Sequence, residues 1–220
     1  MSNLITNYLM VTELVNKLNV SKDAFHEQWS NNKNKRTKHI VVDNFISDEI
    51  CRNIYQNLIS LENKFLWQKY FLQQSKGILK NLDYVSQPTR DIYSAIHSKE
   101  FIGAVENITG IKDLKSDTTF YAGGLTMMNK NDFLSPHIDN SHDKKKEKYR
   151  RINILFYVTP DWSLSRGGNL ELWDKEVKTK KTIVSKFNRM VIMETNKTSW
   201  HSVSQLTSND GRCCLSTYYF

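Results

Sequence analysis

The spacing of hydrophobic positions divides the chain into a helical first half and a second half of short strands. Apolar residues recur at helical spacing over residues 9–18 and 91–108, and Gly110 is placed to end the second of these helices. Ser21 and Ser47 each precede a polar run typical of a helix N-terminus. We therefore expect residues 1 to about 115 to be mainly helical.

From residue 118 onward the hydrophobic pattern alternates with a period of two. Beyond a first short strand at residues 39–45, the candidate strands are residues 118–121, 125–128, 151–158, 169–173, 182–184, 190–194, 201–203 and 212–220. Such a run of short strands with polar turns is typical of a β-sandwich, jelly roll or barrel. No repeat or linker interrupts the chain, which predicts one domain over residues 1–220, its helices packed on a β core from about residue 116.

The charge of the chain raises the question of a nucleic-acid partner. Lys and Arg number 31 against 23 Asp and Glu, a formal net charge of +8. The basic residues gather in residues 32–39, 144–151 and 175–186, and stacking aromatics do not alternate with them as in a single-strand groove. No nucleic-acid recognition motif is present. Solvated loops are the favoured interpretation, and we expect no nucleic-acid partner.

Nothing in the sequence indicates a membrane or a secretory route. The longest uninterrupted apolar stretch runs only from Ile154 to Val158, and the N-terminus lacks a basic and apolar leader. Cys51, Cys213 and Cys214 form no CxxC pair. We expect three buried, reduced thiols in a cytoplasmic protein, with Cys213 and Cys214 on opposite faces of one strand.

Four residues in the β half form a candidate chemical site. In an extended segment, His137 and Asp139 point to the same face and can converge on one ion, and His201 begins a later strand. Two His and one carboxylate bind one face of Fe(II) and leave the opposite positions open. Arg212, at the start of the last strand, is suited to a bidentate pair with a carboxylate.

Each of these residues alone has a simpler explanation. His137 and Asp139 are compatible with a turn, His201 with a satisfied core position and Arg212 with a surface ion pair. Their order and their common location favour the site. A cupin-like module that binds a metal without catalysis remains an alternative. A hydrolytic zinc enzyme is less favoured, because it lacks a general-base Glu beside the site and leaves Arg212 unexplained.

On these motifs the β half resembles the Fe(II)/2-oxoglutarate-dependent dioxygenases, and within them the prolyl hydroxylases, including the hypoxia-sensing type. The resemblance covers about residues 118–220 and rests on segments 133–140, 154–158 with Asp161 and Trp162, 167–170, 186–191, 201–203 and 212–220. It implies a double-stranded β-helix (jelly roll) with N-terminal helices packed on it, an α+β and mainly β fold. It also implies Fe(II), with 2-oxoglutarate and O2 as co-substrates and ascorbate as a candidate reductant.

The resemblance also implies roles for individual residues. His137, Asp139 and His201 would bind iron, and Arg212 would bind the distal carboxylate of 2-oxoglutarate. The co-substrate pocket would further include Tyr157, Leu170 and Ser216, with the Ser216 hydroxyl assisting Arg212. Arg150 and Tyr218 match positions near the substrate, whereas Trp162, Gly167 and Gly168 are expected to be structural. The implied reaction hydroxylates an unactivated C–H bond, most simply of a prolyl or other amino-acid-type substrate.

Two departures from the family pattern leave parts of the site open. A pocket Tyr is usual nine or ten residues before the first His, but Met127 and Met128 stand there and Tyr121 lies further upstream. The basic loop of residues 141–151 has no assigned role. Oxidative demethylases of nucleic acids, the alternative within the superfamily, carry a second Arg where this chain has Tyr218. Whether the substrate is a protein proline, a free amino acid or a natural-product intermediate is open, as is the oligomeric state.

Overall fold

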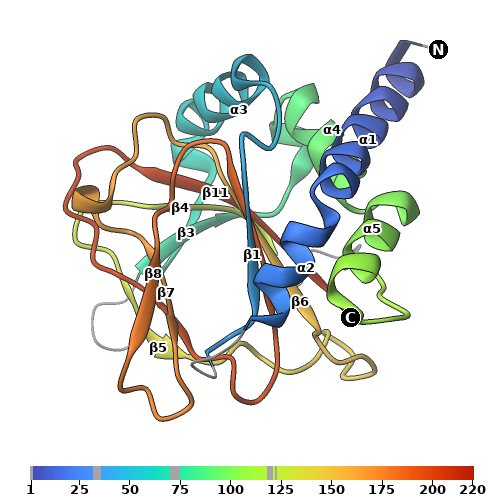
Figure 1. Ribbon diagram of the computed structural model, residues 1–220. Helices are drawn as coiled ribbons and strands as arrows, with labels where there is room; N and C mark the ends of the chain where they lie inside the picture. Colours follow the sequence, from blue (N-terminus) through green and yellow to red (C-terminus); the bar gives the residue numbers. More distant parts are fainter. Residues whose placement is uncertain (1, 32–35, 70–74, 118–120, 122) are drawn as a thin grey trace.

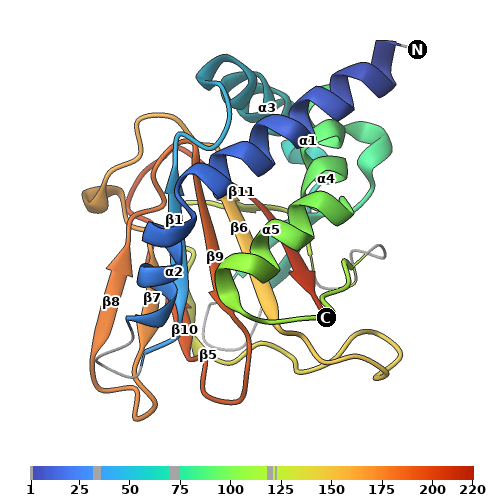
Figure 2. The same ribbon diagram turned by 45° about the vertical axis from the view of Figure 1, so that its right-hand side comes forward.

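Two antiparallel sheets face each other, and helices cover the outer face of the larger sheet (Figures 1 and 2). This computed structural model describes residues 2–31, 36–69, 75–117, 121 and 123–220. The arrangement is the jelly roll that the sequence predicted. No helix within the described residues is long and apolar enough to cross a membrane.

The larger sheet draws its strands from both halves of the chain. In spatial order it consists of β1 (His39–Asp43), β9 (Arg189–Glu194), β6 (Ile152–Tyr157), β11 (Arg212–Tyr219), β4 (Gly124–Met128), β3 (Ser75–Leu79) and β2 (Leu66–Lys69). The sequence pattern predicted all of these strands except β2 and β3. These two pair as a hairpin at one edge of the sheet, and β3 joins it to β4.

The smaller sheet covers the inner face of the larger one. It consists of β5 (Leu134–His137), β10 (His201–Val203), β7 (Leu170–Trp173) and β8 (Lys180–Ile183). Three of these strands were predicted, whereas β5 was not, because its four residues include a proline and show no apolar alternation. Of the strand predicted at residues 118–121, the first three residues lie outside the described part of the chain, and Tyr121 is in a bend.

Five α-helices are described in the first half of the chain. They are α1 (Ser2–Val20), α2 (Lys22–Ser30), α3 (Asp48–Ser60), α4 (Gln87–Ile96) and α5 (Lys99–Thr109), with single 3-10 turns at Glu62–Lys64, Leu82–Tyr84 and Leu164–Arg166. Figure 2 shows α1, α2 and α5 lying across the outer face of the larger sheet.

The prediction of one continuous helix over residues 91–108 was wrong. The chain ends α4 at Ile96 and starts α5 at Lys99, because the Ser98 hydroxyl accepts a hydrogen bond from the Phe101 amide at 3.1 Å. Gly110 ends α5 in the left-handed conformation, as predicted (φ 74°). The Ser47 cap is also confirmed, whereas Ser21 precedes α2 without a side-chain capping bond.

Strand β11 is buried along its whole length because both of its faces are covered. Cys213 and Leu215 belong to the core under the helices, and the Tyr219 hydroxyl donates to the Ile96 carbonyl at the end of α4. The alternate residues, Cys214 among them, face the smaller sheet. The structure thus confirms that the two adjacent cysteines point to opposite faces, and all three cysteines are buried and free.

An aromatic cluster ties the helices to the larger sheet. Phe45, which follows β1, meets Phe156 of β6 edge-on with ring centroids 5.3 Å apart. It meets Phe101 of α5 in the same manner at 6.1 Å. Edge-to-face pairs of this kind add about 0.5–1.5 kcal/mol each beyond the burial of their apolar area. The cluster therefore fixes α5 against the sheet that carries the site.

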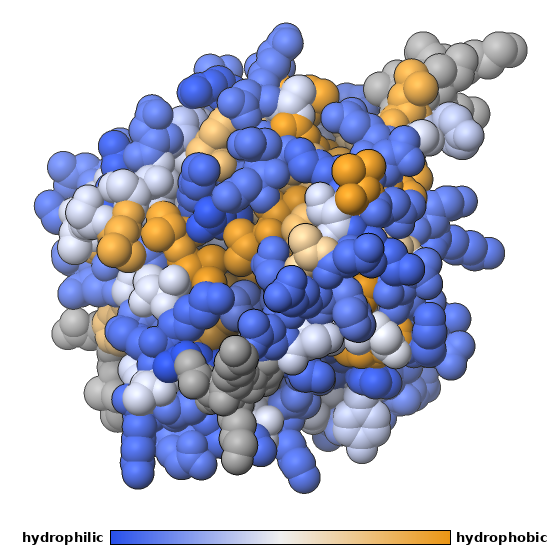
Figure 3. Space-filling view, in the orientation of Figure 1, coloured by the Kyte–Doolittle hydropathy of each residue, from blue (hydrophilic) through white to orange (hydrophobic). Residues whose placement is uncertain are grey.

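The basic runs lie mostly on the surface, as expected of solvated loops. Residues 144–149 and 178–182 are exposed, and residues 32–35 lie outside the described part of the chain. The face in Figure 3 is largely hydrophilic, with hydrophobic side chains gathered near its middle. Arg150 differs from its neighbours in the 141–151 loop, since only 4% of it is exposed.

The contact between α4 and β11 predicts a pH-dependent stability. His97 lies at the end of α4, and its Nε2 is 2.8 Å from the Thr217 hydroxyl of β11. Burial lowers the pKa of His97 from 6.5 to about 4. The folded state thus favours the neutral imidazole. Its stability is complete above pH 6.5 and falls by an amount on the order of 3 kcal/mol as the pH drops to about 4.

We expect His97→Gln to flatten this pH dependence in urea unfolding measured between pH 7 and 4. His142→Gln, which alters a histidine of the surface loop, serves as the control and should follow the parent protein. An unchanged pH profile for His97→Gln would show that another group is responsible.

Candidate metal centre and adjoining pocket

Pairing of two strands of the smaller sheet brings three potential ligands together. His137 ends β5 and pairs directly with His201, the first residue of β10. Their rings lie 4.3 Å apart, and Asp139 follows His137 by two residues. One ligand atom from each of the three side chains lies within 4.8 Å of the other two. The structure therefore places the predicted ligands around one point.

Backbone carbonyls orient both imidazoles. Nδ1 of His137 is 2.7 Å from the Ser135 carbonyl oxygen, and Nδ1 of His201 is 3.0 Å from that of Ser199. Each Nδ1 must carry the proton to donate to a carbonyl, which leaves Nε2 as a free lone pair. Nε2 of His201 lies 3.7 Å from the Asp139 carboxylate.

The carboxylate has a support of its own on the larger sheet. The Asn153 side-chain amide of β6 donates to Asp139 Oδ2 at 3.2 Å and to the Tyr218 hydroxyl at the same distance. Burial, followed by the nearby His201, lowers the pKa of His137 and so favours the neutral form that a metal requires. Two neutral imidazoles and a carboxylate on one face fit Fe(II) with open coordination positions.

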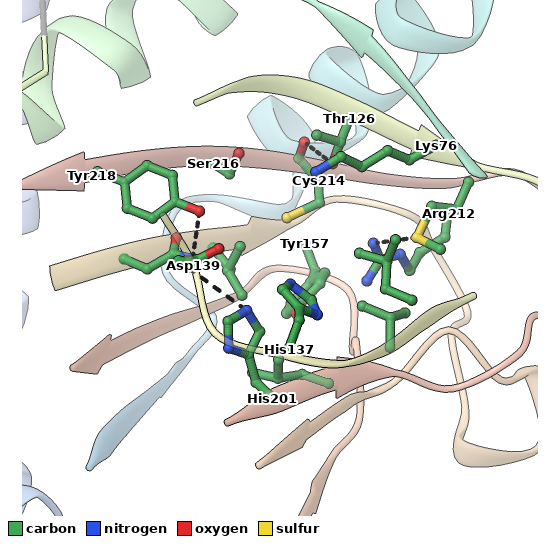
Figure 4. Close-up of a pocket in the computed structure, with 16 residues that line it drawn as sticks. Lys76, Thr126, His137, Asp139, Tyr157, His201, Arg212, Cys214, Ser216 and Tyr218 are labelled. Atoms are coloured by element: carbon green, nitrogen blue, oxygen red, sulfur yellow. Dashed lines mark hydrogen bonds and ion pairs between the residues drawn. The ribbon is translucent and has the colours of Figure 1, made fainter. Parts of the chain in front are cut away.

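A pocket extends from this centre between the two sheets. Its lining is Lys76, Thr126, Met128, Leu134, His137, Asp139, Asn153, Leu155, Tyr157, Leu170, His201, Val203, Arg212, Cys214, Ser216 and Tyr218. Figure 4 shows the three candidate ligands toward one end and Arg212 toward the other. Such a pocket suits an elongated ligand that reaches from the metal to a cation.

Arg212 is a buried cation without a carboxylate partner in the described part of the chain. Its Nη1 donates to the Gly168 carbonyl at 3.0 Å and to the Ser185 hydroxyl at 3.4 Å, and its Nη2 contacts the Met128 sulfur. Its Nε has no hydrogen-bond partner, and only 5% of the residue is exposed. A buried, uncompensated guanidinium is costly, which suits it to an anionic ligand.

The glycine pair beside Arg212 has the structural role expected of it. Gly168, at φ 62°, offers its carbonyl to Arg212, and a Cβ atom there would lie 2.7 Å from Leu206. The Trp162 indole donates to the Gly167 carbonyl at 2.9 Å. Side chains at these two positions would displace the contacts that hold the guanidinium.

The remaining predicted residues fall into two groups. Tyr157, Leu170, Ser216 and Tyr218 line the pocket, and the Tyr157 ring lies 5.3 Å from the guanidinium carbon of Arg212. The Ser216 hydroxyl, however, donates to the Gly124 carbonyl, and the hydroxyl in contact with Arg212 belongs to Ser185. Arg150 is not among the lining residues. Its guanidinium carbon lies 4.3 Å from the centroid of the Tyr218 ring, which does line the pocket.

Sequence reasoning gave no role in the site to several of the residues that line the pocket, and three of these can contribute to its chemistry. Asn153 could have been noticed as an amide in an apolar strand. Met128 was noticed only because it stands where a Tyr is usual, and in the structure it lines the pocket. Lys76 carried no signal, since the β2–β3 hairpin that holds it was not predicted.

Comparison with known proteins identifies relatives for this architecture. Residues 123–220 match the family model described as the 2OG-Fe(II) oxygenase superfamily. The mouse (Mus musculus) protein named prolyl 3-hydroxylase OGFOD1 is 24% identical over 189 residues, covering 83% of this chain and 32% of its own length. The Xenopus laevis protein of that name is 26% identical over 217 residues, covering 89% and 39%. The chain thus spans less than two fifths of the length of these two relatives.

Solved structures share the whole fold at low identity. A Pseudomonas putida prolyl-4-hydroxylase has a TM-score of 0.66 at 12% identity, over 90% of this chain and 97% of that one. A prolyl hydroxylase from Trichoplax adhaerens, solved with a hypoxia inducible factor oxygen degradation domain peptide fragment, has a TM-score of 0.64 at 16% identity. It covers 100% of this chain and 93% of its own.

The geometry of the three ligands predicts the effect of removing one. We expect His201→Ala to weaken Mn(II) binding, measured by calorimetry. The loss of affinity should exceed the roughly 10–100-fold that is typical when a residue hydrogen-bonded to a metal ligand is replaced. His142→Ala, in the surface loop, should bind Mn(II) as the parent protein does. If His201→Ala retained the parental affinity, His201 would be excluded as a ligand.

Proposed function

Because residues 123–220 match the model of the 2OG-Fe(II) oxygenase superfamily and the chain is similar to proteins named prolyl hydroxylases, we propose that it is a member of this superfamily and an Fe(II)- and 2-oxoglutarate-dependent hydroxylase. The observation that supports this best is the pairing of two features across one pocket. A His-Asp-His set lies toward one end, and the buried Arg212 without a carboxylate partner lies toward the other. A metal-binding module without catalysis would have no use for Arg212.

In this proposal the protein residues hold and orient the reactants. His137, Asp139 and His201 bind Fe(II), which with 2-oxoglutarate and O2 supplies the oxidation of a C–H bond to C–OH with release of succinate and CO2. Arg212 binds the distal carboxylate through its guanidinium, and Gly168 and Ser185 hold it in place. Tyr157 and Leu170 form the apolar walls between the two ends. The chain thus supplies position and charge, whereas the metal supplies the chemistry.

We place the substrate at the end of the pocket formed by Tyr218. The Tyr218 hydroxyl lies beside Asn153, which holds Asp139, and the Arg150 guanidinium covers the Tyr218 ring. Nε and Nη2 of Arg150 are buried without a hydrogen-bond partner, so carbonyl oxygens of a peptide or amino acid are suitable acceptors. Relatives named prolyl hydroxylases make a prolyl substrate the first to test. Three free, buried cysteines support a cytoplasmic location.

The proposed reaction predicts turnover of the co-substrate even without the substrate. We expect the purified protein with Fe(II), ascorbate and 2-oxoglutarate to form succinate slowly, measured by mass spectrometry. Peptide and amino-acid libraries that contain proline should then be screened for products heavier by one oxygen atom. His137→Ala is the control and should form no succinate. Absence of both succinate formation and 2-oxoglutarate binding in the parent protein would refute the proposal.

The proposed role of Arg212 predicts that its replacement lowers the affinity for the co-substrate but not the affinity for the metal. Replacing a buried charge that binds an opposite charge costs at least about 2 kcal/mol, so Arg212→Met should weaken 2-oxoglutarate binding by roughly 30-fold or more. Calorimetry with the Mn(II)-loaded protein measures this, and Mn(II) affinity should be retained. Equal affinity of the variant and the parent for 2-oxoglutarate would show that Arg212 does not bind it.

A further inference from the structure

A second cation enters the pocket from a part of the chain outside the family match. Lys76 belongs to β3, and every other residue that lines the pocket lies within residues 123–220. In Figure 4 its side chain runs from the edge of the larger sheet into the pocket, toward Thr126 and Cys214.

The pairing of the strands explains why Lys76 points inward. Gly77 pairs with Met127 of β4, so the next position places Lys76 opposite Met128, and Met128 in turn pairs with Arg212 of β11. Residues directly opposite each other in an antiparallel sheet project from the same face. Lys76, Met128 and Arg212 therefore form one row, and the backbones of the two cations stand roughly 10 Å apart.

The ammonium of Lys76 shares the electrostatic situation of Arg212. Within the residues that the structure describes, no carboxylate oxygen lies within 4 Å of it. Burial lowers the pKa of Lys76, the Asp139 carboxylate opposes this and Arg212 adds to it. Two partly or fully buried cations thus stand at one side of the pocket, facing a single carboxylate at the metal end. A ligand with a negative charge at the Arg212 end of the pocket would compensate the positive charge of both side chains.

We infer that Lys76 is a second anchor for the distal carboxylate of the co-substrate, acting with Arg212. This inference rests on the proposed function and deepens it. Arg212 approaches that carboxylate from β11 and Lys76 approaches it from the β2–β3 hairpin, so the two cations bind it from positions that flank Met128 in one row. Met128, which lies between them, supplies the apolar floor.

Binding of two 2-oxo acids to Mn(II)-loaded protein tests this inference. The first is 2-oxoglutarate, and the second is 2-oxobutyrate, which keeps the ketone and the adjacent carboxylate but lacks the distal one. Lys76→Met preserves the aliphatic stem. Lys69→Met is the matched control, because Lys69 lies on the partner strand of the same hairpin and is exposed. Mn(II) affinity and thermal unfolding establish that each variant is folded.

We expect Lys76→Met to weaken 2-oxoglutarate binding roughly tenfold or more and to leave 2-oxobutyrate binding unchanged. Lys69→Met should bind both acids as the parent protein does. Parental 2-oxoglutarate affinity in a folded Lys76→Met variant would overturn the inference and leave the proposed function intact. Equal losses for both acids would also overturn it, since they would place Lys76 at the metal end. A parent protein that binds neither acid would overturn both proposals.

Discussion

Burial of β11 on both faces is the constraint on which the rest of the structure depends. Its odd-numbered residues face the helices. Tyr219 and Thr217 form hydrogen bonds with the end of α4, and Cys213 and Leu215 fill the core. Its even-numbered residues, from Arg212 to Tyr218, then line the pocket. A slip of one residue would exchange the two sets and place a guanidinium among apolar helices. The helix layer therefore maintains the register that positions Arg212.

The two sheets divide the work of the site between them. The smaller sheet supplies the three candidate metal ligands, and its backbone carbonyls orient both imidazoles. The larger sheet supplies Asn153, which steadies Asp139, and both cations of the pocket. Neither sheet alone forms the pocket, because residues of both sheets line it and together set the separation between the candidate metal ligands and Arg212. A rigid core behind the larger sheet, including the Phe45 cluster, keeps that separation constant.

Much of the site could be predicted from short-range pattern. The His137 and Asp139 spacing places both side chains on one face of an extended chain, whereas the role of Arg212 inside the pocket was implied by the family resemblance. The strands β4, β6, β7, β9, β10 and β11 follow from the same period of two. Local reasoning failed where the signal was weak, as in the four-residue β5 and in the break between α4 and α5, which a single Ser98 cap creates.

What the local pattern could not supply is any contact between segments distant in the chain. The pairing of His201 with His137 and the contact of Ser185 with Arg212 depend on sheet register. The position of Lys76 is the clearest case. Its hairpin is exposed on one strand and lacks strong alternation, so nothing in residues 66–79 marks it as part of a site. Only its pairing with β4 places that lysine on the face of the sheet that lines the pocket, because the register with the partner strand decides which face a side chain occupies.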